Sequence, residues 1–149
     1  MDDIEFVYTV GMDETDLVRR LTESVSGVLS LADGSTAYGV PVSYHYDEAK
    51  NRFLIRLTDD GESSKLRFLD ETEEASFLVH DVEDDEGHSW SVVIRGPIRR
   101  LPDEAFTATE INELFDPLRV FDEDIADLVV HVVELTPTAV TGRTTATGQ

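Results

Sequence analysis

Cationic side chains are rare in this chain, so a place where they gather with hydroxyl groups is informative. Arg56 and Thr58 share one face of a predicted strand, and Ser63, Ser64 and Lys65 follow after a short connection. Ammonium, guanidinium and hydroxyl groups all donate hydrogen bonds to the oxygen atoms of a phosphate. Lys65 also falls in the first turn of a predicted helix, where the helix dipole disfavours a cation by about 0.3 kcal/mol or more unless an anion is bound. The residues predict a phosphate site, and the alternative is a solvated lysine beside an arginine paired to an acid.

The strand predicted over residues 37–46 has a narrow, partly polar face on which a flat ring could lie. That face carries Gly39, Pro41, Ser43 and His45. In a hairpin with the strand 52–58, it lies on the same side of the sheet as Arg56 and Thr58. Strand backbone and the Ser43 hydroxyl could then hydrogen-bond such a ring, and the alternative is a face exposed to solvent.

Other kinds of site lack support in the residue types. The chain has no cysteine, which excludes disulfides, thiolate metal sites and a cysteine nucleophile. It has no glycine-rich dinucleotide or phosphate loop and no nucleophile elbow. The histidines lack metal-ligand spacing, and His80 and His131 are interpreted as ordinary sheet residues. We predict no metal site and assign no catalytic acid or base.

The charge of the chain restricts its partners. It has 32 acidic and 12 basic residues and a formal charge of -20. Such a surface repels nucleic acids and anionic membranes, because binding either requires cations that neutralise phosphates. Dispersed acids and only two lysines, Lys50 and Lys65, are typical of a salt-adapted, halophilic organism. Without a membrane-spanning run or a signal-peptide pattern, we expect a cytoplasmic protein with neither nucleic-acid nor membrane partners.

Period-two alternation predicts the strands that must position these groups. They cover residues 27–32, 37–46, 52–58, 75–82, 88–101 and 128–135. Helices are predicted over 12–24, from Ser63 or Ser64 to Leu69, and over 104–115, with an arm at 1–10 and a Thr-rich peripheral tail at 136–149.

Short hairpins between most of these strands favour one mainly β domain over residues 1–149, a small antiparallel barrel with peripheral helices. Pro41 has no N–H group, so the sheet is expected to end or open on that side of its strand. Gly96-Pro97 predicts a bulge or bend within the strand 88–101. Trp90 is interpreted as buried in a core or a dimer interface, with ring stacking as the alternative.

Several segments, in order, resemble a known family. They are Gly27–Gly34, Tyr38–Asp47, Phe53–Arg56, Ser64-Lys65 and Ser91–Gly96. Together they resemble the pyridoxamine 5′-phosphate oxidase-like split-barrel flavoproteins, in the branch related to nitroimidazole reductases. The resemblance implies a six-stranded antiparallel split β-barrel that forms a homodimer with FMN at the subunit interface.

The resemblance also implies roles for individual residues. The FMN phosphate would be held by Lys65, Ser64 and Ser63, with Arg56, Leu57 and Thr58 beside them. The isoalloxazine ring would be lined by Val42, Ser43 and Tyr44, with Trp90 and Ser91 approaching from the partner subunit and Arg143 closing over the site. Family members often have Gly-Arg-Lys where this chain has Ser63-Ser64-Lys65, so Arg56 would replace the charge missing at Ser64.

A flavin-dependent oxidoreductase is therefore expected, with an unassigned substrate and NAD(P)H or another small molecule as electron donor. One alternative is a reductase that uses the deazaflavin F420 on the same fold, although F420 has a longer anionic tail and would need more cations. Another is a dimer that binds a flavin or haem without catalysis.

Overall fold

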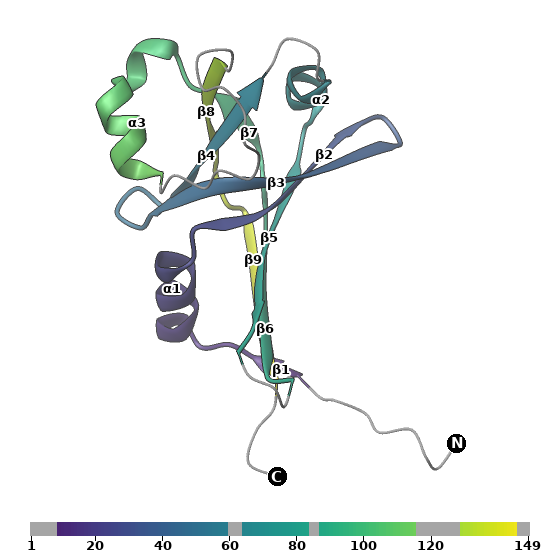
Figure 1. The fold of residues 1–149 in the computed structure, drawn as a ribbon. Helices are drawn as coiled ribbons and strands as arrows, with labels where there is room; N and C mark the ends of the chain where they lie inside the picture. Colours follow the sequence, from purple (N-terminus) through teal and green to yellow (C-terminus); the bar gives the residue numbers. More distant parts are fainter. Residues whose placement is uncertain (1–8, 60–63, 84–86, 116–128, 146–149) are drawn as a thin grey trace.

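The computed structural model describes residues 9–59, 64–83, 87–115 and 129–145, whose nine strands form one antiparallel sheet (Figure 1). The strands are β1 Thr9–Gly11, β2 Ser26–Asp33, β3 Thr36–Asp47, β4 Arg52–Asp59, β5 Ala75–Val82, β6 Ser89–Gly96, β7 Ile98–Arg100, β8 Val129–Leu135 and β9 Ala139–Thr145. Their order across the sheet is β1-β9-β6-β5-β2-β3-β4-β8-β7. The mainly β antiparallel class is confirmed, although the described strands outnumber the six expected.

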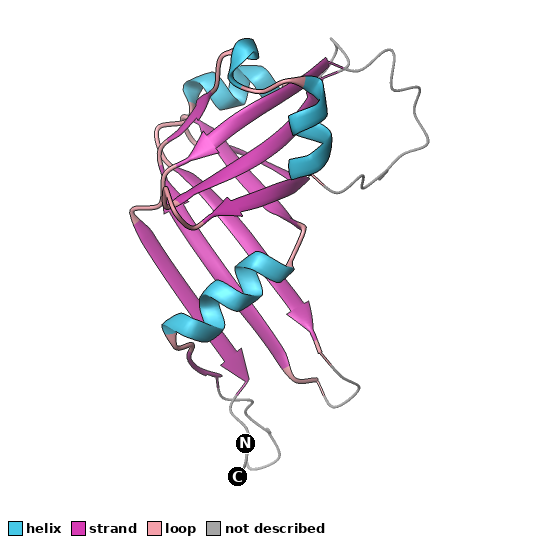
Figure 2. Cartoon of the chain, turned by 90° about the vertical axis from the view of Figure 1, so that its left-hand side faces the viewer, coloured by secondary structure: helices cyan, strands magenta, loops and turns pink. Residues whose placement is uncertain are grey.

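Within the described residues, three α-helices accompany this sheet, and Figure 2 shows them against it. They are α1 Glu14–Glu23, α2 Lys65–Glu71 and α3 Ala108–Leu114, and a 3₁₀ turn, η1, covers Asp103–Ala105. Asp13 caps α1 as predicted, because its side chain accepts the Asp16 N–H at 2.8 Å. None of the described helices has the length and hydrophobicity needed to cross a lipid bilayer.

The two faces of the sheet differ because side chains alternate along each strand. The inner face carries the main core, to which β4 contributes the predicted Phe53, Ile55 and Leu57. We call the opposite side the outer face; it includes Ser43 and Arg56, which are direct partners across β3 and β4. The prediction that these two residues share one side of the sheet is confirmed.

The third helix has its own small core on the outer face. Leu54 and Val132 are buried there with Phe115, beneath α3. The predicted helix 104–115 is interrupted, since η1 is separated from α3 by a capping box in which Thr107 and Glu110 bond each other's backbone N–H groups. The outer face of β4 is therefore apolar at Leu54 and polar only toward Arg56.

Pro41 lies where the sheet opens. Tyr44 donates its backbone N–H to Val25 on the β2 side at 3.0 Å, so by alternation the nitrogen of Pro41 faces the β4 side. The ladder between β3 and β4 ends at the pair of Ser43 and Arg56, before it would reach Pro41. β3 is an interior strand, and the expectation of an opening beside Pro41 is confirmed.

The predicted strand 88–101 is in fact two strands. β6 pairs with β5 and β9, whereas β7 pairs with β8 at the far edge of the sheet. The chain changes partners at Gly96-Pro97, which confirms the predicted bend. There the backbone N–H of Thr136 donates to Pro97 O at 3.0 Å, and that of Thr138 donates to Arg95 O at 2.8 Å.

The prediction of a peripheral tail at 136–149 is wrong for residues 139–145, and residues 146–149 lie outside the described part. Residues 139–145 form β9, an interior strand that pairs with both β6 and β1. The expected arm 1–10 also ends within a strand, since β1 begins at Thr9; the edge strand suggested at residues 4–8 lies outside the described residues.

The end of α1 is joined to the sheet by one buried hydroxyl. Tyr44 is 3% exposed, and its hydroxyl donates to the Leu21 carbonyl at 2.6 Å. Burial raises the pKa of Tyr44 well above its ordinary value, so the hydroxyl stays protonated and remains a donor.

Replacing Tyr44 by phenylalanine is expected to lower the free energy of unfolding by about 1–3 kcal/mol, because the Leu21 carbonyl loses its donor while buried. Urea unfolding followed by circular dichroism measures this loss. The matched control is Tyr46→Phe, which alters a neighbouring, half-buried tyrosine and should change stability by no more than about 0.5 kcal/mol. Equal losses in both variants would contradict the role of the Tyr44 hydroxyl.

Candidate functional site

Four of the predicted site residues lie together around the opening between β3 and β4. We call Ser43, Arg56, Thr58 and Lys65 the β3–β4 cluster. Ser43 is the direct partner of Arg56, and Thr58 follows Arg56 on the same face of β4. The Lys65 ammonium donates to the backbone carbonyl of Thr58 at 3.0 Å.

The position of Lys65 follows from the pairing of β4. Arg56 is paired with β3, and Thr58 lies two residues further along the same strand. The Thr58 carbonyl therefore faces the β3 side, beyond the last pair of the ladder, where Pro41 offers no N–H. Lys65 bonds that carbonyl and so places a cation where the two strands separate.

Arg56 differs from most described arginines in its surroundings. Ion pairs to acids are formed by Arg19, Arg20, Arg52, Arg99 and Arg100. Within the described residues Arg56 joins none of these pairs, although the chain has 32 acids. Its side chain is half-buried on the outer face, two residues from the carbonyl that Lys65 contacts. The cluster thus presents two cationic groups and two hydroxyls that suit a phosphate.

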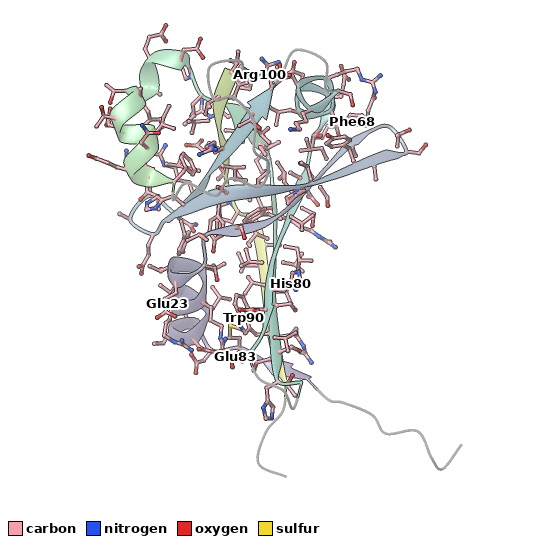
Figure 3. The ribbon with its side chains drawn as sticks, viewed as in Figure 1. Glu23, Phe68, His80, Glu83, Trp90 and Arg100 are labelled. Carbon is pink, nitrogen blue, oxygen red and sulfur yellow. The ribbon has the colours of Figure 1, made fainter. Side chains whose placement is uncertain are left out.

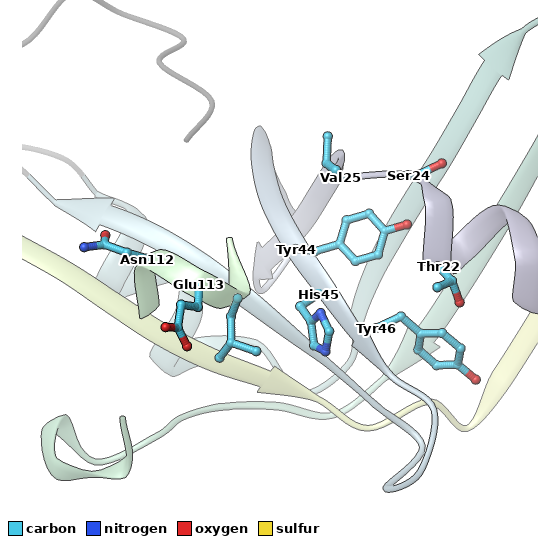
Figure 4. Close-up of a pocket in the computed structure, with 9 residues that line it drawn as sticks. Thr22, Ser24, Val25, Tyr44, His45, Tyr46, Asn112 and Glu113 are labelled. Carbon is cyan, nitrogen blue, oxygen red and sulfur yellow. The ribbon is translucent and has the colours of Figure 1, made fainter. Parts of the chain in front are cut away.

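Three other predicted residues point away from this cluster. Val42, Tyr44 and Leu57 belong to the main core and are 7%, 3% and 2% exposed. Their side chains lie on the inner face, so a ligand on the outer face could meet only their backbone. Figure 4 shows Tyr44 with its hydroxyl directed toward the end of α1, beside a hollow that His45 and α3 also line.

Trp90 is likewise on the inner face, and its interpretation as a buried residue is confirmed. It is 6% exposed, and the Arg20 guanidinium lies 5.1 Å from the centre of its ring. Arg20 also forms ion pairs with Asp16 and Glu83, which joins α1 to the end of β5. The predicted approach of Trp90 to the flavin of a partner subunit stays a prediction.

Ser91 and Arg143 lie in a second group, far from the first. They are direct partners across β6 and β9, and Ser91 is also the partner of His80 on β5. We call His80, Ser91 and Arg143 the β5–β9 row. In Figure 3 His80 points away from α1, toward which Trp90 is directed, and both lie at the opposite end of the sheet from Phe68 of α2.

Of the two predicted serines before α2, the structure describes only Ser64. Ser64 occupies the N-cap position, but its exposed side chain makes no capping hydrogen bond. Ser63 lies outside the described residues. His80 was not predicted as a site residue; strict alternation in Ala75–Val82 would have placed it opposite the buried Phe77 and Val79.

Comparison with known proteins decides the family. A sequence profile described as pyridoxamine 5′-phosphate oxidase matches residues 13–144. The chain belongs to the pyridoxamine 5′-phosphate oxidase family. The matched region includes the β3–β4 cluster and the β5–β9 row of this family member. No curated protein matches the chain.

Solved structures share the fold of this pyridoxamine 5′-phosphate oxidase family member. A FAD-binding protein from Mesorhizobium loti is similar with a TM-score of 0.74 and 18% identity, over 95% of this chain and 100% of the other. A candidate 5-nitroimidazole antibiotic resistance protein from Bacteroides thetaiotaomicron has a TM-score of 0.68 and 13% identity, over 95% and 90%. The FAD binding protein from Mycobacterium smegmatis has a TM-score of 0.62 and 21% identity, over 93% and 100%. The split-barrel class expected from the resemblance is thereby confirmed.

Proposed function

We propose that this protein is a flavoprotein that holds FMN at the β3–β4 cluster. The observation that carries the proposal is the pair of cations, Arg56 and Lys65, at the opening between β3 and β4. Two solved structures of the same fold are named as FAD-binding proteins, which supports a flavin over other phosphorylated ligands. FMN is preferred to FAD because the described part of the cluster offers two cationic side chains, which suit a single phosphate group.

The residues fit such a cofactor in a simple arrangement. Arg56 and Lys65 would hold the phosphate, and Thr58 would add a hydroxyl donor. The ring would lie on the outer face of β3 near Ser43, in contact with strand backbone beside the opening at Pro41. Bound flavin would supply the transfer of electrons, while these residues bind and orient it. We propose an oxidoreductase on this basis, with its substrate and electron donor unassigned.

A homodimer completes the proposal. A row of partly exposed side chains crosses the outer face of four strands, from Pro41 through Val28 and Leu78 to Val93. A second copy covering this row would remove apolar surface from water. Ser91 and Arg143 of one subunit would then approach the flavin of the other, as the family resemblance implies.

Absorption and binding measurements test the flavin. Purified protein is expected to show a flavin spectrum, or to acquire one with FMN, and FMN at 100 times its dissociation constant should stabilise the fold by about 2.7 kcal/mol. Riboflavin, which lacks the phosphate, is the matched control and should stabilise it much less. The proposal would be refuted if the protein is colourless and its melting temperature does not change when FMN is added. The spectrum also separates FMN from F420 and haem, and sedimentation equilibrium tests the dimer.

A further inference from the structure

A hollow lies at the edge of β3, where this strand extends past the start of β2. Ser26, the first residue of β2, pairs with Ser43, and beyond that pair no described strand is bonded to β3 on this side. The hollow is lined by the end of α1, the segment that joins α1 to β2, residues 44–46 of β3 and the end of α3 (Figure 4). We call it the α1–α3 hollow. Its volume is about 300 Å³, which suits a small ligand.

The α1–α3 hollow is separate from the β3–β4 cluster. The cluster lies where β3 parts from β4, beyond the pair of Ser43 and Arg56. The hollow lies on the opposite edge of β3, where Tyr44 donates its backbone N–H to Val25. No member of the cluster borders the hollow. A ligand in the hollow therefore meets a different set of side chains.

The polar side chains of the hollow offer lone pairs rather than protons. Thr22 already donates its hydroxyl proton to the Val18 carbonyl at 2.7 Å. Tyr44 donates its own to the Leu21 carbonyl at 2.6 Å. The Glu113 carboxylate can only accept, and the lining includes no lysine or arginine. A ligand that matches these groups must bring donors of its own.

The charge around the hollow also favours a cation. The Glu113 carboxylate forms no hydrogen bond or ion pair within the described residues, so it is available to a ligand. Burial and the carboxylates of Glu48 and Glu14 raise the pKa of Tyr46, which shows that two further acids act on this side of the hollow. The formal charge of -20 adds to the same negative potential.

Apolar and flat surface borders the same space. Val25 lines the hollow and is 40% exposed, and Leu114 lines it from α3. Figure 4 shows the imidazole ring of His45 between Glu113 on one side and Tyr46 on the other. An apolar body held near His45 would cover Val25, while a donor attached to it could reach the carboxylate.

We propose that the α1–α3 hollow binds a small organic cation. Its ammonium group donates to the Glu113 carboxylate, and its apolar body rests against His45 and Val25. Binding of this cation goes beyond the proposed flavin function and does not depend on it, because the two sites share no side chain.

Benzylamine is a suitable probe, because its ammonium group is charged at neutral pH, as that of lysine is, and benzyl alcohol is its uncharged counterpart. Calorimetry at about 0.15 M salt is expected to show benzylammonium binding that is about tenfold or more tighter than benzyl alcohol binding. Glu113→Gln should weaken benzylammonium binding by about tenfold. Asn112→Asp adds a carboxylate to the same wall and should tighten it several-fold.

Glu71→Gln is the matched control, since it removes an exposed carboxylate from the end of α2, outside the hollow, and should leave benzylammonium binding unchanged. Equal affinity for the two probes overturns the proposal, as does the absence of saturable binding or binding that neither α3 variant alters. Equal weakening by Glu113→Gln and Glu71→Gln also overturns it, because a cation attracted to the whole acidic surface behaves in that way.

The same titration with FMN-saturated protein separates this site from the flavin. The affinity for benzylammonium should be the same with and without FMN. If FMN excludes benzylammonium, the cation occupies the flavin's own site and the separate hollow is wrong. If FMN fails to bind while benzylammonium binding still depends on Glu113, the proposed flavin function falls and the cation site stands.

Discussion

Replacing Gly96 by alanine is expected to lower the free energy of unfolding by about 3 kcal/mol or more, enough to unfold much of the protein. A Cβ atom at this position would lie 1.8 Å from the Thr136 carbonyl oxygen and 3.2 Å from Pro137 Cα. Both contacts are with backbone, which cannot rotate away as a side chain could. Urea unfolding and the yield of folded protein measure the effect.

Gly39→Ala is the matched control for this experiment. Gly39 also lies in a strand of the sheet, but a Cβ there would be 3.9 Å from Ser30 Oγ and 4.0 Å from Val28 Cγ1. These are ordinary contacts, so the change in stability should stay within about 1 kcal/mol. If Gly96→Ala proves as stable as Gly39→Ala, the close approach of the two chain segments at Gly96 is wrong.

The double variant Arg56→Ala, Lys65→Ala is expected to bind FMN about 100-fold more weakly than the native chain. Each substitution removes a charge-assisted hydrogen bond to the phosphate, worth about 1.5 kcal/mol or more, or about tenfold in affinity. Binding of riboflavin should change little, because riboflavin has no phosphate. Fluorescence titration with both flavins measures the difference.

Lys50→Ala is the control for the loss of a lysine. Lys50 is exposed in the turn between β3 and β4, outside the β3–β4 cluster. Its replacement should leave the affinity for FMN unchanged at the ionic strength of the assay. Equal weakening of FMN and riboflavin by the double variant would show that the substitutions damaged the fold rather than removed a phosphate contact.

The sequence predicted the β3–β4 cluster well where its geometry depends on residues that are close together in the chain. Alternation along β3 and β4 placed Ser43 and Arg56 on one side, and the pairing depends on a hairpin of a few residues. Pro41 marked the opening of the sheet because a missing N–H group has a direct geometrical consequence. The same alternation could have separated Val42 and Tyr44 from Ser43, since neighbouring residues on a strand face opposite ways.

The strand β9 could not be predicted in the same way. Its first three residues, Ala139, Val140 and Thr141, are exposed, so burial leaves no clear alternating pattern there. The threonine-rich composition suggested a peripheral tail, whereas a Cβ at Gly142 would lie 3.0 Å from Met12 Cβ and 3.1 Å from Leu17 Cδ1. A side chain at this position would be in tight contact with a segment about 130 residues earlier in the chain, which no local pattern reveals. The position of His80 beside Ser91 was missed for a similar reason, because its partner comes from another strand, β6.

The places of β8 and β9 in the sheet have a consequence for the nascent chain. β8 pairs with the edge of β4, and β9 pairs with the edge of β6. Both edges therefore stay unpaired until residues 129–145 have been synthesised, after all the other described strands. Until then β4 and β6 each expose a row of unpaired backbone groups, the kind of edge on which chains aggregate. A chain that stops before residue 129 would therefore lose more than a tail, because it would expose two unpaired strand edges that are prone to aggregate.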